Sequence, residues 1–155
     1  MPIYLVQHGL SNSKEVDPER KLTEEGAADV TRIAGVAKGY SVKVAKILHS
    51  GKERARMTAE IFAKHLLPPL GVAQIDGINP DDDVISFAQS VDPDSGTMYV
   101  GHLPFMQKLA SFLVSGNDRI TVFKFQNGGI VCLDRDVNAK LWHIKWALMP
   151  RVGQG

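Results

Sequence analysis

Blocks of apolar residues with two different periods alternate along this chain. Residues 3–6 are mostly apolar and β-favouring, and they stop at Gln7-His8-Gly9, which predicts a short buried strand followed by a turn. The polar stretch from Leu10 to Arg20 predicts a loop. Apolar residues then recur at helical spacing up to Gly39, with Thr23 as candidate N-cap.

The same alternation predicts the elements that follow. Strands are expected at 42–48, 72–75 and 97–100, and helices from Ser50 to Pro68, from Asn79-Pro80 onward, and from Pro104 to Gly116. Past residue 120 the pattern changes to three short strands at 121–125, 130–133 and 141–146. In the last strand we expect Trp142, Ile144 and Trp146 to share one face.

This order of elements predicts an α/β protein. Strand and helix alternate four times before the three final strands, which favours a three-layer α/β/α sandwich whose central sheet is mainly parallel, with antiparallel C-terminal strands. We expect a single domain over residues 1–155, in which 150–155 form a frayed tail.

Composition and charge exclude several classes of binding partner and site. The formal net charge is +1 at pH 7, so no overall field favours nucleic acid or a membrane surface. The single cysteine, Cys132, excludes an intrachain disulfide and a Cys-rich metal site. No apolar run approaches the roughly 18 residues of a membrane span. The N-terminus lacks a basic region followed by a long apolar run, so we expect no signal peptide and a cytoplasmic protein.

Candidate chemistry lies at three predicted strand-to-helix junctions. His8 follows the first strand, Arg54 follows the second, and His102 follows the strand at 97–100. Parallel strands bring such junctions to one edge of the sheet, where ligands bind in open α/β folds. Arg54 stands four residues after Ser50, the candidate N-cap of its helix, and therefore beside free backbone N–H groups. Two histidines and an arginine there predict a site for a dianion.

These residues carry a resemblance. His8-Gly9 after the first strand, Leu22-Thr23 with Gly26, Ser50 with Arg54-Ala55 and Thr58, and Gly101-His102 resemble the histidine phosphatase superfamily, which has the phosphoglycerate-mutase-like fold. The small size and His102-Leu103-Pro104 look most like its SixA-type phosphohistidine phosphatase branch. The resemblance extends from Ile3 to about Met149.

The resemblance implies a phosphoryl transfer in two steps. His8 would attack phosphorus and become a phosphohistidine, which water then hydrolyses. Arg54 and His102 would bind the phosphoryl oxygens and stabilise their charge. The scheme requires no metal and no cofactor. No HxxxH or HExxH pair is present, which also argues against a zinc site.

The chain departs from the family directly before the nucleophile. The family usually has arginine there, and this chain has Gln7. An amide can donate to a phosphate oxygen but brings neither charge nor a guanidinium fork. Lys14, Lys52 or Arg56 could supply the missing charge.

Two further positions are candidates, Asp83 from the same resemblance and Ser11 from its place in the chain. Larger members carry a glutamate that protonates the leaving group, and Asp83 matches an acidic position of the SixA-type pattern. The alternative for Asp83 is a solvent-facing charge at the start of a helix. Ser11 follows the nucleophile loop and is either a phosphate ligand or a turn residue.

The leading hypothesis is a phosphatase that acts on phosphohistidine in a protein. A chain without an obvious acid favours a phosphoramidate, because the leaving imidazole is easily protonated. One alternative is a module that binds phosphorylated ligands or proteins without turnover, because Gln7 replaces arginine. A second is a phosphatase for small phosphorylated metabolites. We expect a monomer or weak dimer.

Overall fold

The computed structural model describes residues 1–154, in which strand and helix alternate four times before two final strands. The strands are β1 (Ile3–Gln7), β2 (Lys46–His49), β3 (Val72–Gln74), β4 (Thr97–Gly101), β5 (Ile130–Asp134) and β6 (His143–Leu148). The helices are α1 (Glu24–Gly39), α2 (Glu53–Leu66), α3 (Val84–Gln89) and α4 (Phe105–Ser115).

The strands form one sheet in the order β3-β2-β4-β1-β5-β6. Neighbours among β3, β2, β4 and β1 run parallel, whereas β5 is antiparallel to β1 and β6 is antiparallel to β5. The predicted mainly parallel sheet with antiparallel C-terminal strands is confirmed.

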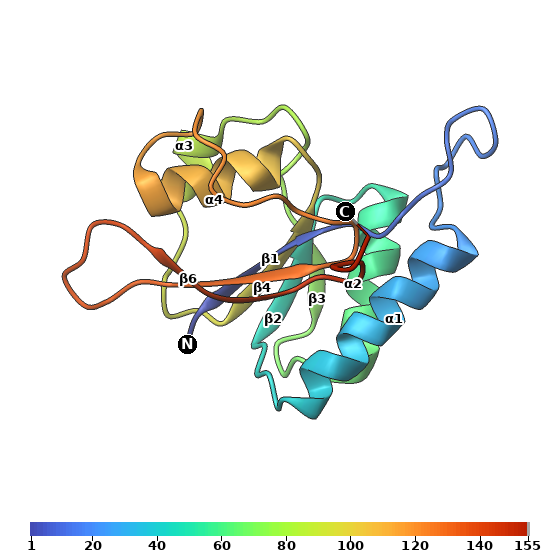
Figure 1. The fold of residues 1–155 in the computed structure, drawn as a ribbon, viewed down its shortest axis with the longest axis horizontal. Helices are drawn as coiled ribbons and strands as arrows, with labels where there is room; N and C mark the ends of the chain where they lie inside the picture. The colour runs from blue at the N-terminus through green and yellow to red at the C-terminus, as the bar shows by residue number, and fades with distance from the viewer. Residues whose placement is uncertain (155) are drawn as a thin grey trace.

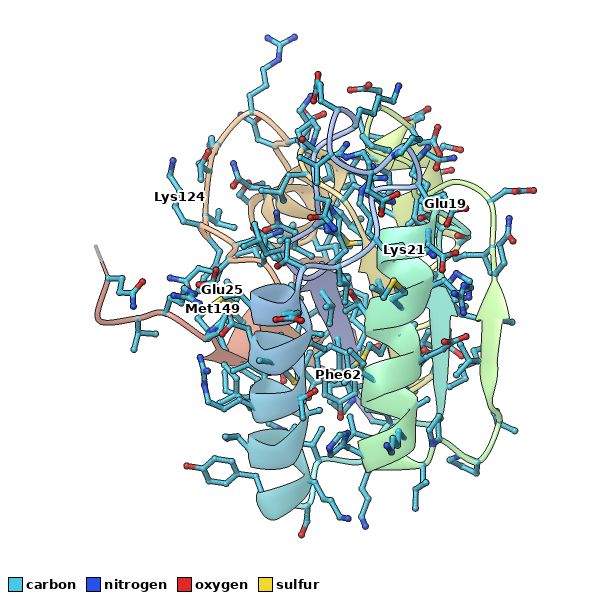
Figure 2. The ribbon with its side chains drawn as sticks, turned by 90° about the vertical axis from the view of Figure 1, so that its right-hand side faces the viewer. Glu19, Lys21, Glu25, Phe62, Lys124 and Met149 are labelled. Atoms are coloured by element: carbon cyan, nitrogen blue, oxygen red, sulfur yellow. The ribbon has the colours of Figure 1, made fainter. Side chains whose placement is uncertain are left out.

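Helices cover both faces of the sheet, with α1 and α2 on one side and α3 and α4 on the other (Figure 1). The side chains of β1 alternate between the two resulting cores, because successive residues of a strand point to opposite faces. Tyr4 and Val6 belong to the core under α1 and α2, and Ile3 and Leu5 to the core under α3 and α4. Figure 2 shows Phe62, which is fully buried, between α1 and α2. The three-layer α/β/α class is therefore confirmed.

Local sequence signals fix the ends of the longer helices. The Thr23 hydroxyl accepts a hydrogen bond from the Gly26 N–H, as predicted for the N-cap of α1. Gly116 ends α4 in the left-handed conformation that glycine adopts without a steric penalty.

The strand expected at 121–125 does not form, and that prediction is wrong. Both edges of β1 are already paired, with β4 and β5. The segment packs against α4 instead: the Val122 N–H lies 3.4 Å from the Ser111 hydroxyl, and Phe125 is buried in the core beside α4. Its apolar residues close the core rather than extend the sheet.

The predicted common face of the last strand is also wrong. Leu133 pairs with Ile144 and Cys132 pairs with Trp146, so a bulge places Lys145 outside the regular register. Trp142 and Ile144 therefore pack on the α4 side, and Trp146 packs on the α1 side.

The starts of two elements differ from expectation. β2 begins at Lys46 rather than at residue 42. α3 begins at Val84, because Asp83, and not the Asn79-Pro80 pair, caps its N-terminus.

The prediction of a frayed tail is wrong at Arg151. Its Nε donates to the buried Asp29 carboxylate at 2.9 Å, and its guanidinium also pairs with Glu25. The Gln126 side chain accepts from the Arg151 N–H at 2.8 Å. Gly155 lies outside the described residues.

Across residues 1–154, no helix has the length and apolar character needed to span a membrane.

Candidate active site

The carboxyl ends of the adjacent parallel strands β1 and β4 bring the predicted histidines together. Gln7 of β1 pairs with Gly101 of β4, and the His8 N–H donates to the Gly101 carbonyl at 2.9 Å. The residue that follows β1 and the residue that follows β4 are therefore both histidines, His8 and His102, at the same edge of the sheet. The imidazole centroids of His8 and His102 are 5.1 Å apart, and the rings are tilted by 54°. The predicted convergence of these two residues is found.

Hydrogen bonds fix the loop that carries His8. The Gly9 N–H donates to the Thr58 hydroxyl at 2.9 Å, and the Asn127 amide donates to the His8 carbonyl at 3.0 Å. The His8 Nδ1 atom lies 2.7 Å from the Gly9 carbonyl oxygen. Because a carbonyl only accepts, Nδ1 carries the proton of the neutral ring and Nε2 keeps its lone pair. Nε2 is therefore the nucleophilic atom of His8.

Arg54 lies in the first turn of α2, as predicted, but Ser50 does not cap that helix. The N-cap is Lys52, which makes no side-chain capping bond. The Ser50 hydroxyl instead lies 2.6 Å from Nε2 of His102. The Arg54 carbonyl accepts from the Thr58 hydroxyl at 2.8 Å, so the residue that supports the Gly9 N–H also bonds the Arg54 backbone.

Unpartnered polar atoms gather at this edge of the sheet. Four buried side-chain polar atoms of the described residues have no hydrogen-bond partner, and three of them are Gln7 Oε1, Arg54 Nε and His102 Nδ1. Leaving a buried polar group unpaired costs about 1–3 kcal/mol. Rotating the Gln7 amide by 180° exchanges its oxygen and nitrogen and turns that group into a donor. The cluster then presents hydrogen-bond donors to a ligand that carries hydrogen-bond acceptors, such as an oxyanion.

The electrostatic environment keeps both histidines neutral. Burial lowers the pKa of His8 to about 4, the bond to the Gly9 carbonyl opposes this effect, and the charges of Arg54 and Arg20 add to it. Burial also lowers the pKa of His102 to about 3, with further contributions from His8 and Arg54, and then from Lys52 and Arg20. At neutral pH both rings are therefore uncharged, and the positive charge around them belongs to the arginines and Lys52.

Arg20 is a site residue that the sequence analysis missed. Its charge lowers the pKa values of His8, His102 and Arg54. Its Nε donates to the Asn12 carbonyl at 3.2 Å, and its backbone has a φ of 53°, uncommon for a residue other than glycine. The only signal in the sequence was its place just before Leu22-Thr23.

The loop of residues 10–22 folds back over the first turn of α2. An isolated bridge joins Ser11 to Leu22. The pKa of Glu53 is lowered, mainly by its hydrogen bond to Arg56 and to a smaller extent by the charge of Lys21. Figure 2 shows Glu19 and Lys21 at the same end of the molecule as the start of α2. This return of the chain brings Arg20 towards the histidines.

Lys14, Lys52 and Arg56 were the cations expected to compensate for Gln7. Of these three, only Lys52 contributes to the lowered pKa of a site histidine, His102. Arg56 forms ion pairs with Glu53 and Glu60.

The Asp83 side chain caps the N-terminus of α3. Its Oδ1 accepts from the Ile85 and Ser86 N–H groups at 3.0 and 3.2 Å. Asp83 also lines a cavity of about 660 Å³ together with Asp82, and the described residues of its wall do not include His8, Arg54 or His102. The role of Asp83 as acid stays a prediction, and so does phosphate binding by Ser11.

Comparison with known proteins places this fold in a structural class. No protein-family profile and no curated protein matches the chain. Among solved structures, it is similar to the protein histidine phosphatase SixA complexed with tungstate (TM-score 0.80, 23% identity, 97% of both chains). The putative phosphohistidine phosphatase SixA from Agrobacterium tumefaciens gives a TM-score of 0.78 at 23% identity, over 96% of this chain and 97% of that one.

More distant enzymes share the same architecture. A mycobacterial glucosyl-3-phosphoglycerate phosphatase complexed with VO3 gives a TM-score of 0.69 at 12% identity, over 94% of this chain and 97% of that one. The chain has the phosphoglycerate-mutase-like fold of the histidine phosphatases. The resemblance seen in the sequence is thereby confirmed at the level of the fold.

Proposed function

We propose that this protein is a phosphatase of the histidine phosphatase type that forms a phosphohistidine on His8. The observation that carries the proposal is the environment of His8 Nε2. Its lone pair is free because Nδ1 is bound to the Gly9 carbonyl, and the His102 ring lies 5.1 Å away, centroid to centroid. Unpartnered groups of Gln7 and Arg54 lie at the same edge.

In the first step, the Nε2 lone pair attacks phosphorus while the bond from phosphorus to the leaving group breaks and its electron pair departs with that group. Arg54 and Arg20 offset the negative charge of the phosphoryl oxygens. In the second step, water attacks the phosphorus of phosphohistidine, which releases phosphate and restores the neutral imidazole.

We propose phosphohistidine in a protein as the substrate. Asp83 is bound to the N-terminus of α3 and is not needed as an acid for a phosphoramidate, because the leaving imidazole takes its proton from solvent. An alkyl phosphate, by contrast, needs a positioned acid. The solved structures with the same fold include a protein histidine phosphatase SixA and a putative phosphohistidine phosphatase SixA, which supports this choice.

Labelling tests the proposal directly. Incubating the protein with a ³²P-phosphohistidine protein and quenching rapidly should yield labelled protein whose label is lost in acid and kept in base. His8→Ala should abolish both label and turnover. His143→Ala, which removes an exposed histidine of β6, should change neither. A label that persists in His8→Ala would overturn the proposal.

A second candidate function rests on Gln7, which brings an amide where related enzymes have a charged arginine. On this reading the site binds phosphorylated proteins without turning them over. It predicts saturable vanadate binding together with phosphohistidine turnover equal to that of His8→Ala.

A further inference from the structure

The Ser50 side chain lies within hydrogen-bond distance of the buried His102 ring. Its hydroxyl oxygen lies 2.6 Å from Nε2 of His102, and the two residues are 7% and 1% exposed. They stand at the ends of the paired strands β2 and β4. Neither residue can exchange this contact for bulk water without opening the sheet edge.

The protons of this pair can be assigned by counting donors and acceptors. A serine hydroxyl has one proton to donate and can accept two hydrogen bonds. The Lys52 N–H points at the Ser50 oxygen from 3.4 Å, as a weak donor. Among residues 1–154, His102 Nε2 is the other hydrogen-bond partner of that hydroxyl. Ser50 therefore has an acceptor for its proton only if Nε2 carries none.

Placing the proton of His102 on Nε2 instead leaves two hydrogen-bonding groups without a suitable partner. If Nε2 carried the proton, the Ser50 hydroxyl would accept from both Lys52 and His102 and its own buried proton would have no acceptor. Nδ1 of His102, which is buried and has no partner, would then present a lone pair. A lone pair beside Arg54 and an incoming anion repels the anion, whereas an N–H group binds it.

The charge state of His102 makes this choice matter. A charged imidazole donates from both nitrogens, but a neutral one donates from only one. Burial and the neighbouring charges of Lys52, Arg54 and Arg20 lower the pKa of His102 to about 3. At neutral pH the ring has a single N–H, and its position decides whether the ring can bind a phosphoryl oxygen.

We propose that Ser50 is a positioning residue that donates to Nε2 of neutral His102, so that the Nδ1–H of this ring is available to donate to a phosphoryl oxygen bound beside His8. The catalytic consequence rests on the proposed phosphatase function, but the tautomer does not. The two can therefore be tested separately.

Long-range ¹H–¹⁵N NMR of histidine-labelled protein at pH 7 reads the tautomer. In the wild type we expect a protonated Nδ1 and an unprotonated Nε2 for His102. Ser50→Ala should shift the proton toward Nε2, and Ser50→Thr, which keeps the hydroxyl, should restore the original pattern. A wild-type ring protonated at Nε2, or a tautomer unchanged in Ser50→Ala, would overturn the proposal. The wild-type spectrum decides even if a variant fails to fold.

Kinetics supply the second readout. Ser50→Ala should lower kcat by about ten- to a hundredfold, as expected when one hydrogen bond to a charged group is lost. The matched control is Ser111→Ala, which removes a buried hydroxyl that donates to the Gln107 carbonyl in α4. It should leave both kcat and the His102 signals unchanged. Wild-type protein without turnover but with Nδ1 protonated would contradict the proposed function and support the tautomer.

Discussion

At the scale of single residues, the imidazole rings and the positive charge of the site belong to different residues. His8 and His102 are both held neutral by burial, so the positive charge needed for a phosphoryl dianion comes from elsewhere. In the proposed reaction, Arg54 provides this charge from the first turn of α2, and Arg20 provides it from the loop between β1 and α1. In the reaction that we propose, the neutral Nε2 of His8 attacks a phosphoryl group whose charge is already offset by two guanidinium groups.

Removing one of these charges should weaken the reaction. Arg20→Gln is expected to lower kcat/KM for a phosphohistidine substrate by about ten- to a hundredfold, the value of one charge-assisted hydrogen bond. The control is Arg56→Gln, which removes a cation that pairs with Glu53 and Glu60 on the same surface and should change kcat/KM less than twofold, about 0.4 kcal/mol. Steady-state kinetics that show equal effects would contradict the role of Arg20.

The sequence predicted His8, Arg54 and His102 because each follows a strand that its apolar residues identify. Arg20 escaped because it lies in a polar loop without periodicity, and the return of that loop depends on the bridge from Ser11 to Leu22. Ser50 was predicted to cap α2. Its hydroxyl is instead taken by His102, a residue that lies 52 positions away and that local reasoning could not bring near.

At the scale of elements, the loop that follows β1 and carries His8 is held by close packing against the start of α1. The Thr23 N–H donates to the Leu10 carbonyl at 3.0 Å. A Cβ atom on Gly26 would lie 2.1 Å from that same carbonyl oxygen. Only glycine lets the helix approach the loop this closely. The position of His8, two residues before Leu10, depends on this contact.

Gly26→Ala should therefore displace the loop. We expect a loss of about 1–3 kcal/mol in the free energy of unfolding, as for other overpacked sites, and reduced activity. The control is Gly35→Ala in the same helix, where a Cβ meets nothing within 4 Å. That variant should gain about 0.5–1 kcal/mol, because alanine favours the helix. Urea denaturation measures both, and a neutral Gly26→Ala would contradict the close contact.

Helices and parallel strands were predictable because their periods and caps are local, as at Thr23 and Gly116. The elements that failed depend on distant partners. Residues 121–125 have strand-like composition but find both edges of β1 paired. The face of Trp146 is reversed by a bulge whose position is set by pairing with Cys132 and Leu133. Arg151 is fixed by Asp29, 122 residues earlier in the chain.

At the scale of the whole molecule, the buried histidines couple stability to pH. In the unfolded chain a histidine has a pKa near 6.5, whereas burial lowers the pKa of His8 to about 4 and that of His102 to about 3. Below pH 6.5 the unfolded state therefore binds protons that the folded state does not. The contribution of the two histidines to the free energy of unfolding is fully present above about pH 6.5 and is lost as the pH decreases through 4 for His8 and toward 3 for His102.

Urea denaturation at pH 7.5 and pH 5 tests this coupling. The free energy of unfolding should be lower at pH 5, and the difference should shrink in His8→Asn, which removes one of the histidines whose pKa burial lowers. His143→Asn, which changes an exposed histidine of β6, should keep the full difference. A wild-type stability that does not change between the two pH values would show that the rings are not held neutral by the fold.

The structure of the protein bound to orthovanadate would test the central claim most directly. Vanadate adopts the five-coordinate geometry of phosphoryl transfer. We predict that His8 Nε2 bonds to vanadium and that the equatorial oxygens accept from Arg54, Arg20 and Nδ1 of His102. Vanadate bound away from His8, or a His102 ring turned away from the ion, would contradict the account.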